Sequence, residues 1–179
     1  MAVLAEASTI ASARRIMLIG CPGAGKSTLA TVLGRRFHLP VVHLDRLWWL
    51  PGWKERTSID FDERLAKVLA QPEWIIDGNY TRTLPLRLAE AHVVIWLDFP
   101  RMLCLRRVLW RRIRFHGQTR QDLTPGCPER IDLEFLGYIW SFHKKVRPRI
   151  MAALAAHDCR ARVVRLKSPR DAAHFLSSM

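Results

Sequence analysis

The side chains best suited to chemistry in this 179-residue sequence lie in residues 20–28, which read GCPGAGKST. The spacing Gly-x-x-x-x-Gly-Lys-Ser falls between an apolar run and a helical pattern, which is the context that a phosphate-binding loop requires. Glycines carry no Cβ, so successive backbone N–H groups can turn toward phosphate oxygens, and the positive end of the following helix faces the same anion. The stretch predicts a cradle for the phosphates of a nucleotide.

Individual residues of this loop are expected to take different roles. Lys26 would reach the β and γ phosphates, and the Ser27 hydroxyl would ligate Mg²⁺. The other members of the cradle are Gly20, Cys21, Pro22, Gly23, Ala24, Gly25 and Thr28. The expected cofactors are therefore ATP and Mg²⁺. The alternative is a glycine-rich turn that only happens to precede a lysine, and the flanking strand and helix patterns argue against it.

The elements that must position this loop alternate along the chain. Strands are predicted at residues 15–19, 41–44, 74–76, 92–97 and 162–166. Helices are predicted from Ser27 to before Pro40, from Thr57 or Ser58 to Gln71, and over 101–115, 130–156 (interrupted at Pro148) and 171–176. The first strand is a continuous apolar run suited to a sheet covered on both faces, and the alternation of strands and helices indicates an α/β fold. Residues 116–129 are polar and rich in Gly and Pro, and they predict a short mobile lid.

Length and composition limit the class of protein. A chain of 179 residues favours one domain, and no apolar run reaches the roughly 18 residues that a membrane span needs. The four cysteines are scattered without a Cys-x-x-Cys pair, so neither a zinc site nor a disulfide framework is indicated, and reduced thiols in the cytoplasm are expected. Residues 1–13 lack the features of a signal peptide and predict a flexible leader to a single domain over 14–179. A monomer is the default expectation.

The net charge of +13 has two interpretations, an anionic small-molecule site or a nucleic-acid surface. Seven arginines and no acid occur between residues 101 and 120. A solvated helix normally mixes signs, so this run indicates that an anion is bound there, with a plain basic surface as the alternative. Within the predicted helix 101–115, Met102, Leu105, Leu109 and Ile113 form an apolar stripe, and Arg107, Arg111 and Arg114 recur on another side.

Acids stand at the ends of three predicted strands. Asp77 is the preferred candidate for the acid that holds Mg²⁺, because Gly78 follows it and lets the backbone approach a ligand. Asp98 is the competitor, although it can instead cap the next helix. Asp45 is expected at the ligand-facing edge of the sheet, where it is the best general base for an acceptor hydroxyl, with His43 second.

Three tryptophans, Trp48, Trp49 and Trp53, follow Asp45 around a Pro-Gly turn signal. An indole in such a loop can form the wall of an acceptor pocket and shield a reaction from water. The same cluster can instead hold the loop onto the body of the protein. The sequence leaves both interpretations open.

Together these motifs resemble the nucleoside monophosphate kinase group of P-loop proteins, which includes adenylate and shikimate kinases. The resemblance is carried by GCPGAGKST, the Leu44-Asp45 strand end with its tryptophans, WIIDGNY at 74–80, WLDFP at 96–100, and Arg107 with Arg111. Within the group the chain is most similar to the small topology modulation proteins. This resemblance implies a P-loop NTPase fold, three-layer α/β/α, with a five-stranded parallel sheet in the order 2-3-1-4-5 and a short lid.

The resemblance also implies roles for single residues. Lys26, Ser27 and the loop glycines match the ATP and Mg²⁺ site, and Arg107 and Arg111 match the lid arginines that approach the transferring phosphoryl group. Asp45 is similar to the acid that shikimate kinases use on their acceptor hydroxyl. The residues expected to bind the acceptor are Asp45, Trp48, Trp53, Asp77, Gly78 and Arg82. Trp48 stands where adenylate kinases place an arginine, and Arg82 lies one residue later than in the family, which argues against AMP as the acceptor.

The expected function is transfer of the γ-phosphoryl group of ATP to a small acceptor, a nucleotide, nucleoside or hydroxylated metabolite, with Lys26, Asp45, Arg107 and Arg111 as the catalytic residues. A different hypothesis is a nucleic-acid-binding protein that affects DNA topology and uses ATP as a switch, motivated by the net charge and by the basic run at 144–147. A third is a nucleotide-hydrolysing module without an acceptor.

Overall fold

A computed structural model of the protein describes residues 10, 12–120, 122–156 and 161–179. Most of the predicted leader, residues 1–9 and 11, lies outside the described residues. Ile10 and Ala13 are buried in the hydrophobic core, so the described end of that segment packs with the domain.

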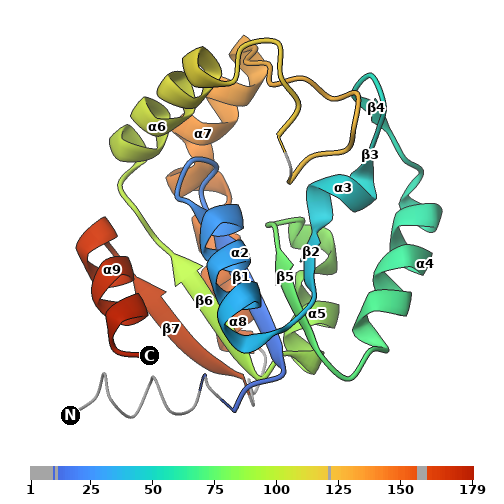
Figure 1. Ribbon diagram of the computed structural model, residues 1–179, viewed down its shortest axis with the longest axis vertical. Coiled ribbons are helices and arrows are strands. Elements are labelled where there is room, and N and C mark those ends of the chain that lie inside the picture. Colours follow the sequence, from blue (N-terminus) through green and yellow to red (C-terminus); the bar gives the residue numbers. More distant parts are fainter. Residues whose placement is uncertain (1–9, 11, 121, 157–160) are drawn as a thin grey trace.

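The centre of the molecule is a parallel sheet (Figure 1). Its strands, in spatial order, are β2 (Val41–His43), β5 (Trp74–Asp77), β1 (Arg15–Gly20), β6 (Val93–Leu97) and β7 (Arg162–Leu166). All four neighbouring pairs are parallel. Counted among these five strands alone, the order is 2-3-1-4-5, so the predicted sheet is confirmed. Strands β5 and β6 are buried along their whole length, as expected for apolar runs covered on both faces.

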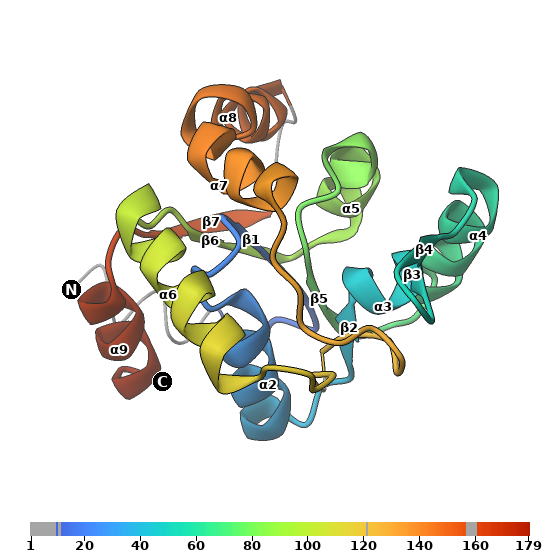
Figure 2. The same ribbon diagram turned by 90° about the horizontal axis from the view of Figure 1, so that it is seen from above.

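Helices cover both faces of the sheet, which confirms the three-layer architecture. Figure 2 shows α2, α6 and α9 on one side and α5, α7 and α8 on the other. Their bounds are Lys26–Phe37 (α2), Leu84–Glu90 (α5), Arg101–Arg114 (α6), Leu133–Lys145 (α7), Arg147–Ala156 (α8) and Pro169–Ser177 (α9). The helix α4 (Ser58–Leu69) starts at the predicted cap, because the Thr57 hydroxyl accepts a hydrogen bond from the amide of Asp60. None of the helices in the described ranges is long and apolar enough to cross a membrane.

Five short elements were not predicted: α3 (Leu44–Trp48), β3 (Trp49–Leu50), β4 (Lys54–Glu55), a 3₁₀ turn (Thr81–Thr83) and α5. The strand before Asp45 ends at His43, and Asp45 lies in the first turn of the helix α3. The tryptophan loop contains an antiparallel hairpin of β3 and β4. After β5 the chain forms a short 3₁₀ turn and then α5. Strands of two residues are too short for an alternating pattern, so the sequence gives no periodic signal for the hairpin.

The apolar stripe on α6 does not form the buried face of that helix. Cys104 and Val108 are buried there, whereas Met102 is 61% exposed and Ile113 is 77% exposed. The reason is the close approach of α6 to the phosphate-binding loop, since a Cβ placed at Gly23 would lie 2.4 Å from the carbonyl oxygen of Cys104. The helix therefore buries the residues that face the loop, and its most apolar stripe faces α7 and solvent.

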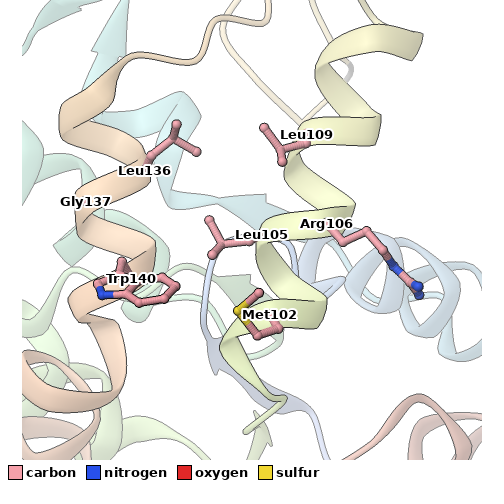
Figure 3. A pocket seen from close by; sticks show the side chains of 7 residues that line it. All are labelled: Met102, Leu105, Arg106, Leu109, Leu136, Gly137 and Trp140. Atoms are coloured by element: carbon pink, nitrogen blue, oxygen red, sulfur yellow. The ribbon is translucent and has the colours of Figure 1, made fainter.

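Part of that stripe lines a shallow apolar groove between α6 and α7, with a volume of about 510 Å³ (Figure 3). Its floor is formed by Leu105 and Leu109 from α6 and by Leu136 and Trp140 from α7. The Arg101 guanidinium lies over the Trp140 ring, 4.2 Å from its centroid. The lining residues of the groove include one charged side chain, that of Arg106, and no acid, cysteine or hydroxyl side chain.

Candidate active site

A large cleft opens at the carboxyl edge of the sheet, with a volume of about 1710 Å³. Parallel α/β sheets place ligands at this edge. The cleft is lined by most of the predicted site residues: Pro22, Gly23, Ala24, Gly25, Lys26, Ser27, Thr28, Asp45, Trp48, Trp53, Asp77, Gly78, Arg107 and Arg111. Gly20, Cys21 and Arg82 are not among the lining residues. One cavity thus joins the phosphate-binding loop to the candidate acceptor side.

The phosphate-binding loop has the backbone that its glycines allow. Gly23 and Gly25 have positive φ angles of 83° and 101°. Gly25 caps α2 without any side-chain hydrogen bond. Within the described chain, the amides of Lys26, Ser27 and Thr28 have no hydrogen-bond acceptor. These N–H groups at the positive end of a helix are therefore free to bind an anion in the cleft, so the loop fits a nucleotide triphosphate.

Lys26 folds back over the loop that carries it. Its Nζ donates to the carbonyl oxygens of Gly20, at 2.9 Å, and Cys21, at 3.3 Å. Gly20 and Cys21 are buried beneath the loop, which explains why neither reaches the cleft. Their contribution is to hold the Lys26 ammonium at the edge of the phosphate cradle.

Asn79 connects the end of β5 to the start of this loop. Its side-chain amide donates to the carbonyl oxygen of Gly20 at 2.9 Å, and its Oδ1 accepts from the amide of Gly20 at 3.0 Å. Both backbone groups of one loop residue are thereby satisfied by one side chain. No role was predicted for Asn79, although an asparagine directly after a strand-end Asp-Gly is a residue type able to make this pair of bonds.

Arg87, on α5, is a second residue that the sequence analysis missed. It is fully buried, and its guanidinium donates to three successive carbonyl oxygens, those of Gly78 (2.9 Å), Asn79 and Tyr80 (3.1 Å). Burial lowers the pKa of Arg87 to about 9. These bonds hold the turn after β5, in which Tyr80 has a left-handed backbone with φ of 30°.

Tyr80 from that turn contacts Asp45. The Tyr80 hydroxyl donates to Asp45 Oδ1 at 2.9 Å. Burial and then the negative charge of Asp77 raise the pKa of Asp45, which the hydrogen bond from Tyr80 opposes. Burial and the charge of Asp45 raise the pKa of Tyr80, so the shared proton stays on the tyrosine. Asp45 lines the cleft and keeps Oδ2 as an acceptor for a ligand.

Asp77 lies at the end of β5, in register with His43 at the end of β2. Asp77 is 4% exposed, and its Oδ2 lies 3.1 Å from His43 Nδ1. Burial works to lower the pKa of His43, but the hydrogen bond to Asp77 and its charge raise it overall. His43 is therefore a hydrogen-bond partner of Asp77, and of the two candidate bases only Asp45 lines the cleft.

Asp98, the competitor of Asp77, lies outside the cleft lining. Its carboxylate accepts hydrogen bonds from Arg147 Nε at 3.1 Å and Arg165 Nε at 2.9 Å. Burial opposes them, but these bonds keep the pKa of Asp98 below its usual value. The expectation that Asp98 caps the next helix is wrong, because the N-cap of α6 is Pro100. Asp98 joins α8 to β7 instead.

The predicted lid arginines lie along the side of α6 that faces the cleft. Arg107 Nη1 donates to the carbonyl oxygen of Ala24 at 3.2 Å. Arg111 forms an ion pair with Glu129 at 2.8 Å, and Arg120 pairs with the same carboxylate at 2.7 Å. Burial lowers the pKa of Arg111, and the neighbouring charge of Arg120 acts in the same direction. The buried Glu129 thus holds two arginines together at the lid.

The lid is fastened to the tryptophan hairpin. The Gly52 amide donates to the Gly126 carbonyl at 2.9 Å, and Trp53 Nε1 donates to the Pro128 carbonyl at 3.0 Å. Trp48 packs on the Tyr80 ring with 6.0 Å between centroids, and Trp53 packs on Trp49 at 5.3 Å. The tryptophans tie the hairpin to the body and also line the cleft, and their role as the wall of an acceptor pocket stays a prediction.

Arg82 does not join the candidate acceptor residues. Its guanidinium makes two hydrogen bonds to Asp62 on α4, at 2.7 and 2.8 Å. The structure therefore does not bring Arg82 together with Asp45 and Trp48. The cause is the carboxylate of Asp62, which lies on a different element, α4. A comparison of motifs within residues 74–83 does not include this partner.

The strand order and the phosphate-binding loop define the P-loop fold of the shikimate kinase type. Among solved structures, a shikimate kinase from Bacteroides thetaiotaomicron is 20% identical, covers 93% of this chain and 94% of that chain, and superposes with a TM-score of 0.56. A shikimate kinase from Acinetobacter baumannii, solved in complex with shikimate, is 15% identical, and the match covers 96% of this chain and 93% of that chain with a TM-score of 0.56. No protein-family model and no curated protein matches the sequence. At these identities the likeness shows the fold alone.

Proposed function

We propose that this protein is an ATP-dependent kinase that transfers the γ-phosphoryl group to the hydroxyl of a small acceptor. The observation that carries the proposal is that one cleft holds both the unpaired amides of the phosphate-binding loop and the Asp45 carboxylate. Phosphoryl transfer requires positioning and charge stabilisation more than covalent participation by the protein. A cleft that joins an anion cradle to a general base meets both needs.

On the nucleotide side, the loop amides would bind the phosphates and Lys26 would move from the Gly20 carbonyl to the phosphate oxygens. Ser27 and Asp77 line the cleft and would hold Mg²⁺, which neutralises charge on the nucleotide when bound. The described residues contain no cluster of three or more metal-ligating side chains. That fits Mg²⁺, which binds through few protein ligands together with substrate phosphates and water.

On the lid side, Arg107 already contacts the loop, and Arg111 follows one turn later on the same face of α6. Both guanidinium groups would stabilise negative charge on the transferring group. The lid and hairpin together would exclude water that otherwise hydrolyses ATP.

On the acceptor side, Asp45 would accept the proton of the attacking hydroxyl as the oxygen bonds to phosphorus. The hydrogen bond from Tyr80 occupies Asp45 Oδ1 and leaves Oδ2 as the oxygen that would accept this proton. Asp45→Asn should reduce phosphoryl transfer by about 10²–10⁴-fold, the usual contribution of a general base. ATP affinity and the free energy of unfolding should not fall, because the asparagine side chain can still accept the hydrogen bond from the Tyr80 hydroxyl and the substitution removes a buried charge.

Transfer rates and the affinity for an ATP analogue, measured on both proteins, check this expectation. Leu86→Ala serves as the control, since Leu86 is 60% exposed and lies outside the cleft lining. Equal losses of transfer and nucleotide affinity in Asp45→Asn would contradict a role on the acceptor side.

The pH dependence of transfer should also report Asp45. Its raised pKa means that it becomes protonated, and inactive as a base, at a higher pH than the 3.8 usual for aspartate. The rate should therefore fall on the acid side at a pH above that value, while circular dichroism shows the fold intact. Any residual activity of Asp45→Asn should lack this acid limb. A wild-type rate that stays constant until the protein unfolds would overturn the assignment.

The nucleic-acid alternative remains a prediction, and the site does not favour it. In the basic run at 144–147, Val146 is buried and Arg147 is paired with Asp98, which leaves only the two lysines exposed. Membership of the topology modulation group and a cytoplasmic location are likewise predictions that rest on the sequence.

A further inference from the structure

The charge of the cleft differs from the charge of the whole protein. The chain carries 29 lysines and arginines against 16 acids. Among the residues that line the cleft, however, seven are acids and seven are lysines or arginines. The cleft is therefore formally neutral in a strongly basic protein, and this balance limits which acceptors it can hold.

Two of the positively charged side chains that line the cleft lie at the phosphate-binding loop, where they would bind the nucleotide. Lys26 lies on the loop carbonyls, and Arg107 contacts Ala24 of the same loop. A bound triphosphate would attract both groups, because its own charge is negative. Once they are assigned to the nucleotide, the rest of the cleft has more acids than bases.

The cations nearest to the lid are already paired. Arg111 and Arg120 share Glu129, and Arg120 also pairs with Asp122 at 2.8 Å. Arg130 lies over the Trp53 ring at 5.3 Å and is 3.4 Å from Asp132. Arg82, which could have bound an anionic acceptor, is paired with Asp62 and is not among the residues that line the cleft.

The remaining two lining cations, Arg106 and Arg149, are exposed at the rim. The part of the acceptor side that is most enclosed instead presents carboxylates. Asp77 is close enough for its charge to raise the pKa of Asp45, and the charge of Asp122 acts on Asp45 in the same direction. An acceptor phosphate or carboxylate placed against Asp45 would be repelled by the carboxylates of Asp45 and Asp122, whereas bound Mg²⁺ would offset the charge of Asp77.

Aromatic rings also contribute to the lining of the cleft. Trp48, Trp49, Trp53, Tyr80, Phe135 and Tyr138 all line it. Rings of this kind bind flat apolar surfaces by stacking, and they bind cations through their negative faces.

Resting on the proposed kinase function, we infer that the acceptor is an alcohol with a flat apolar face that carries no phosphate or carboxylate group. It is uncharged or positively charged, and its hydroxyl lies against Asp45. The acceptor thus differs in charge from a nucleoside monophosphate and from a hydroxy acid.

The test uses aromatic alcohols of one shape and three charges: mandelate, 1-phenylethane-1,2-diol and 2-amino-1-phenylethanol. Nucleosides, each compared with its own 5′-monophosphate, extend the test to acceptors with a larger ring system. Affinities are measured by calorimetry on the full chain saturated with Mg²⁺ and a nonhydrolysable ATP analogue, and transfer from ATP is followed by ³¹P NMR. We expect the neutral and cationic members to bind at least about ten-fold more tightly than their anionic counterparts, which corresponds to about 1.4 kcal/mol.

Two matched variants test whether the cleft causes the preference. Asp122→Asn removes one negative charge from the cleft and should reduce the discrimination against anions several-fold. Glu63→Gln removes a negative charge from an exposed position of α4 outside the cleft lining and should leave the discrimination unchanged. Equal effects of the two variants would overturn the assignment.

Failure of the inference can be told apart from failure of the kinase proposal. If the ATP analogue binds and anionic alcohols bind as well as or better than the others, or if no neutral or cationic alcohol binds, the acceptor class is wrong while the nucleotide site stands. If the analogue does not bind, or binds equally to Lys26→Ala, the proposed kinase function and the inference both fall.

Discussion

Lys26→Ala is expected to reduce nucleotide turnover by about 10²–10³-fold, the usual cost of removing one charge-stabilising donor from a transition state. The structure gives the reason, since the Lys26 ammonium is held over the phosphate cradle by the Gly20 and Cys21 carbonyls. Phosphate release from ATP and transfer to an acceptor are the quantities to measure.

The fold should survive this change, because Lys26 lies at the start of α2 with its side chain at the edge of the cleft. Lys67→Ala is a suitable control, since Lys67 is exposed on α4, and it should leave turnover unchanged. Wild-type turnover in Lys26→Ala would remove the loop from the mechanism.

Arg87→Met should produce the largest loss of stability. The variant leaves the carbonyls of Gly78, Asn79 and Tyr80 without their donor in a buried site. Breaking a buried charged network costs about 3–5 kcal/mol of unfolding free energy, because the remaining polar groups stay desolvated. For a domain of this size the melting temperature should fall by roughly 10 °C.

Thermal and denaturant unfolding measure this effect. Arg170→Met changes an exposed arginine of α9 and should leave the melting temperature nearly unchanged. An Arg87→Met protein as stable as the wild type would show that the turn after β5 does not depend on this guanidinium.

The sequence predicted the elements that carry a strong local signal. The apolar strands, the phosphate-binding loop and the capped helix after Thr57 are each specified by residues close together in the chain. The order of the strands came from the family resemblance, and the structure confirms it. Of the predicted site residues, Lys26, Asp45, Asp77 and Arg107 all line the cleft at the carboxyl edge of the sheet.

The residues that were missed or misplaced depend on contacts between distant segments. Nothing in the local sequence distinguishes Arg87 from an ordinary polar residue. Its burial depends on the turn after β5, whose carbonyl oxygens accept its hydrogen bonds. Arg82 was expected beside the acceptor, but Asp62, twenty positions earlier, binds it instead. The stripe on α6 was correctly recognised as apolar, yet the buried face is chosen by the glycine loop that approaches Cys104.

The neutral cleft within a basic protein has a kinetic consequence. Under the proposed kinase function, the surplus of positive charge outside the cleft would draw the ATP anion toward the molecule by long-range steering, so its association rate would fall as salt shortens the Debye length. An uncharged alcohol gains nothing from this field and arrives by diffusion alone. Raising the ionic strength would thus lower the association rate of the nucleotide and leave the association rate of its co-substrate unchanged.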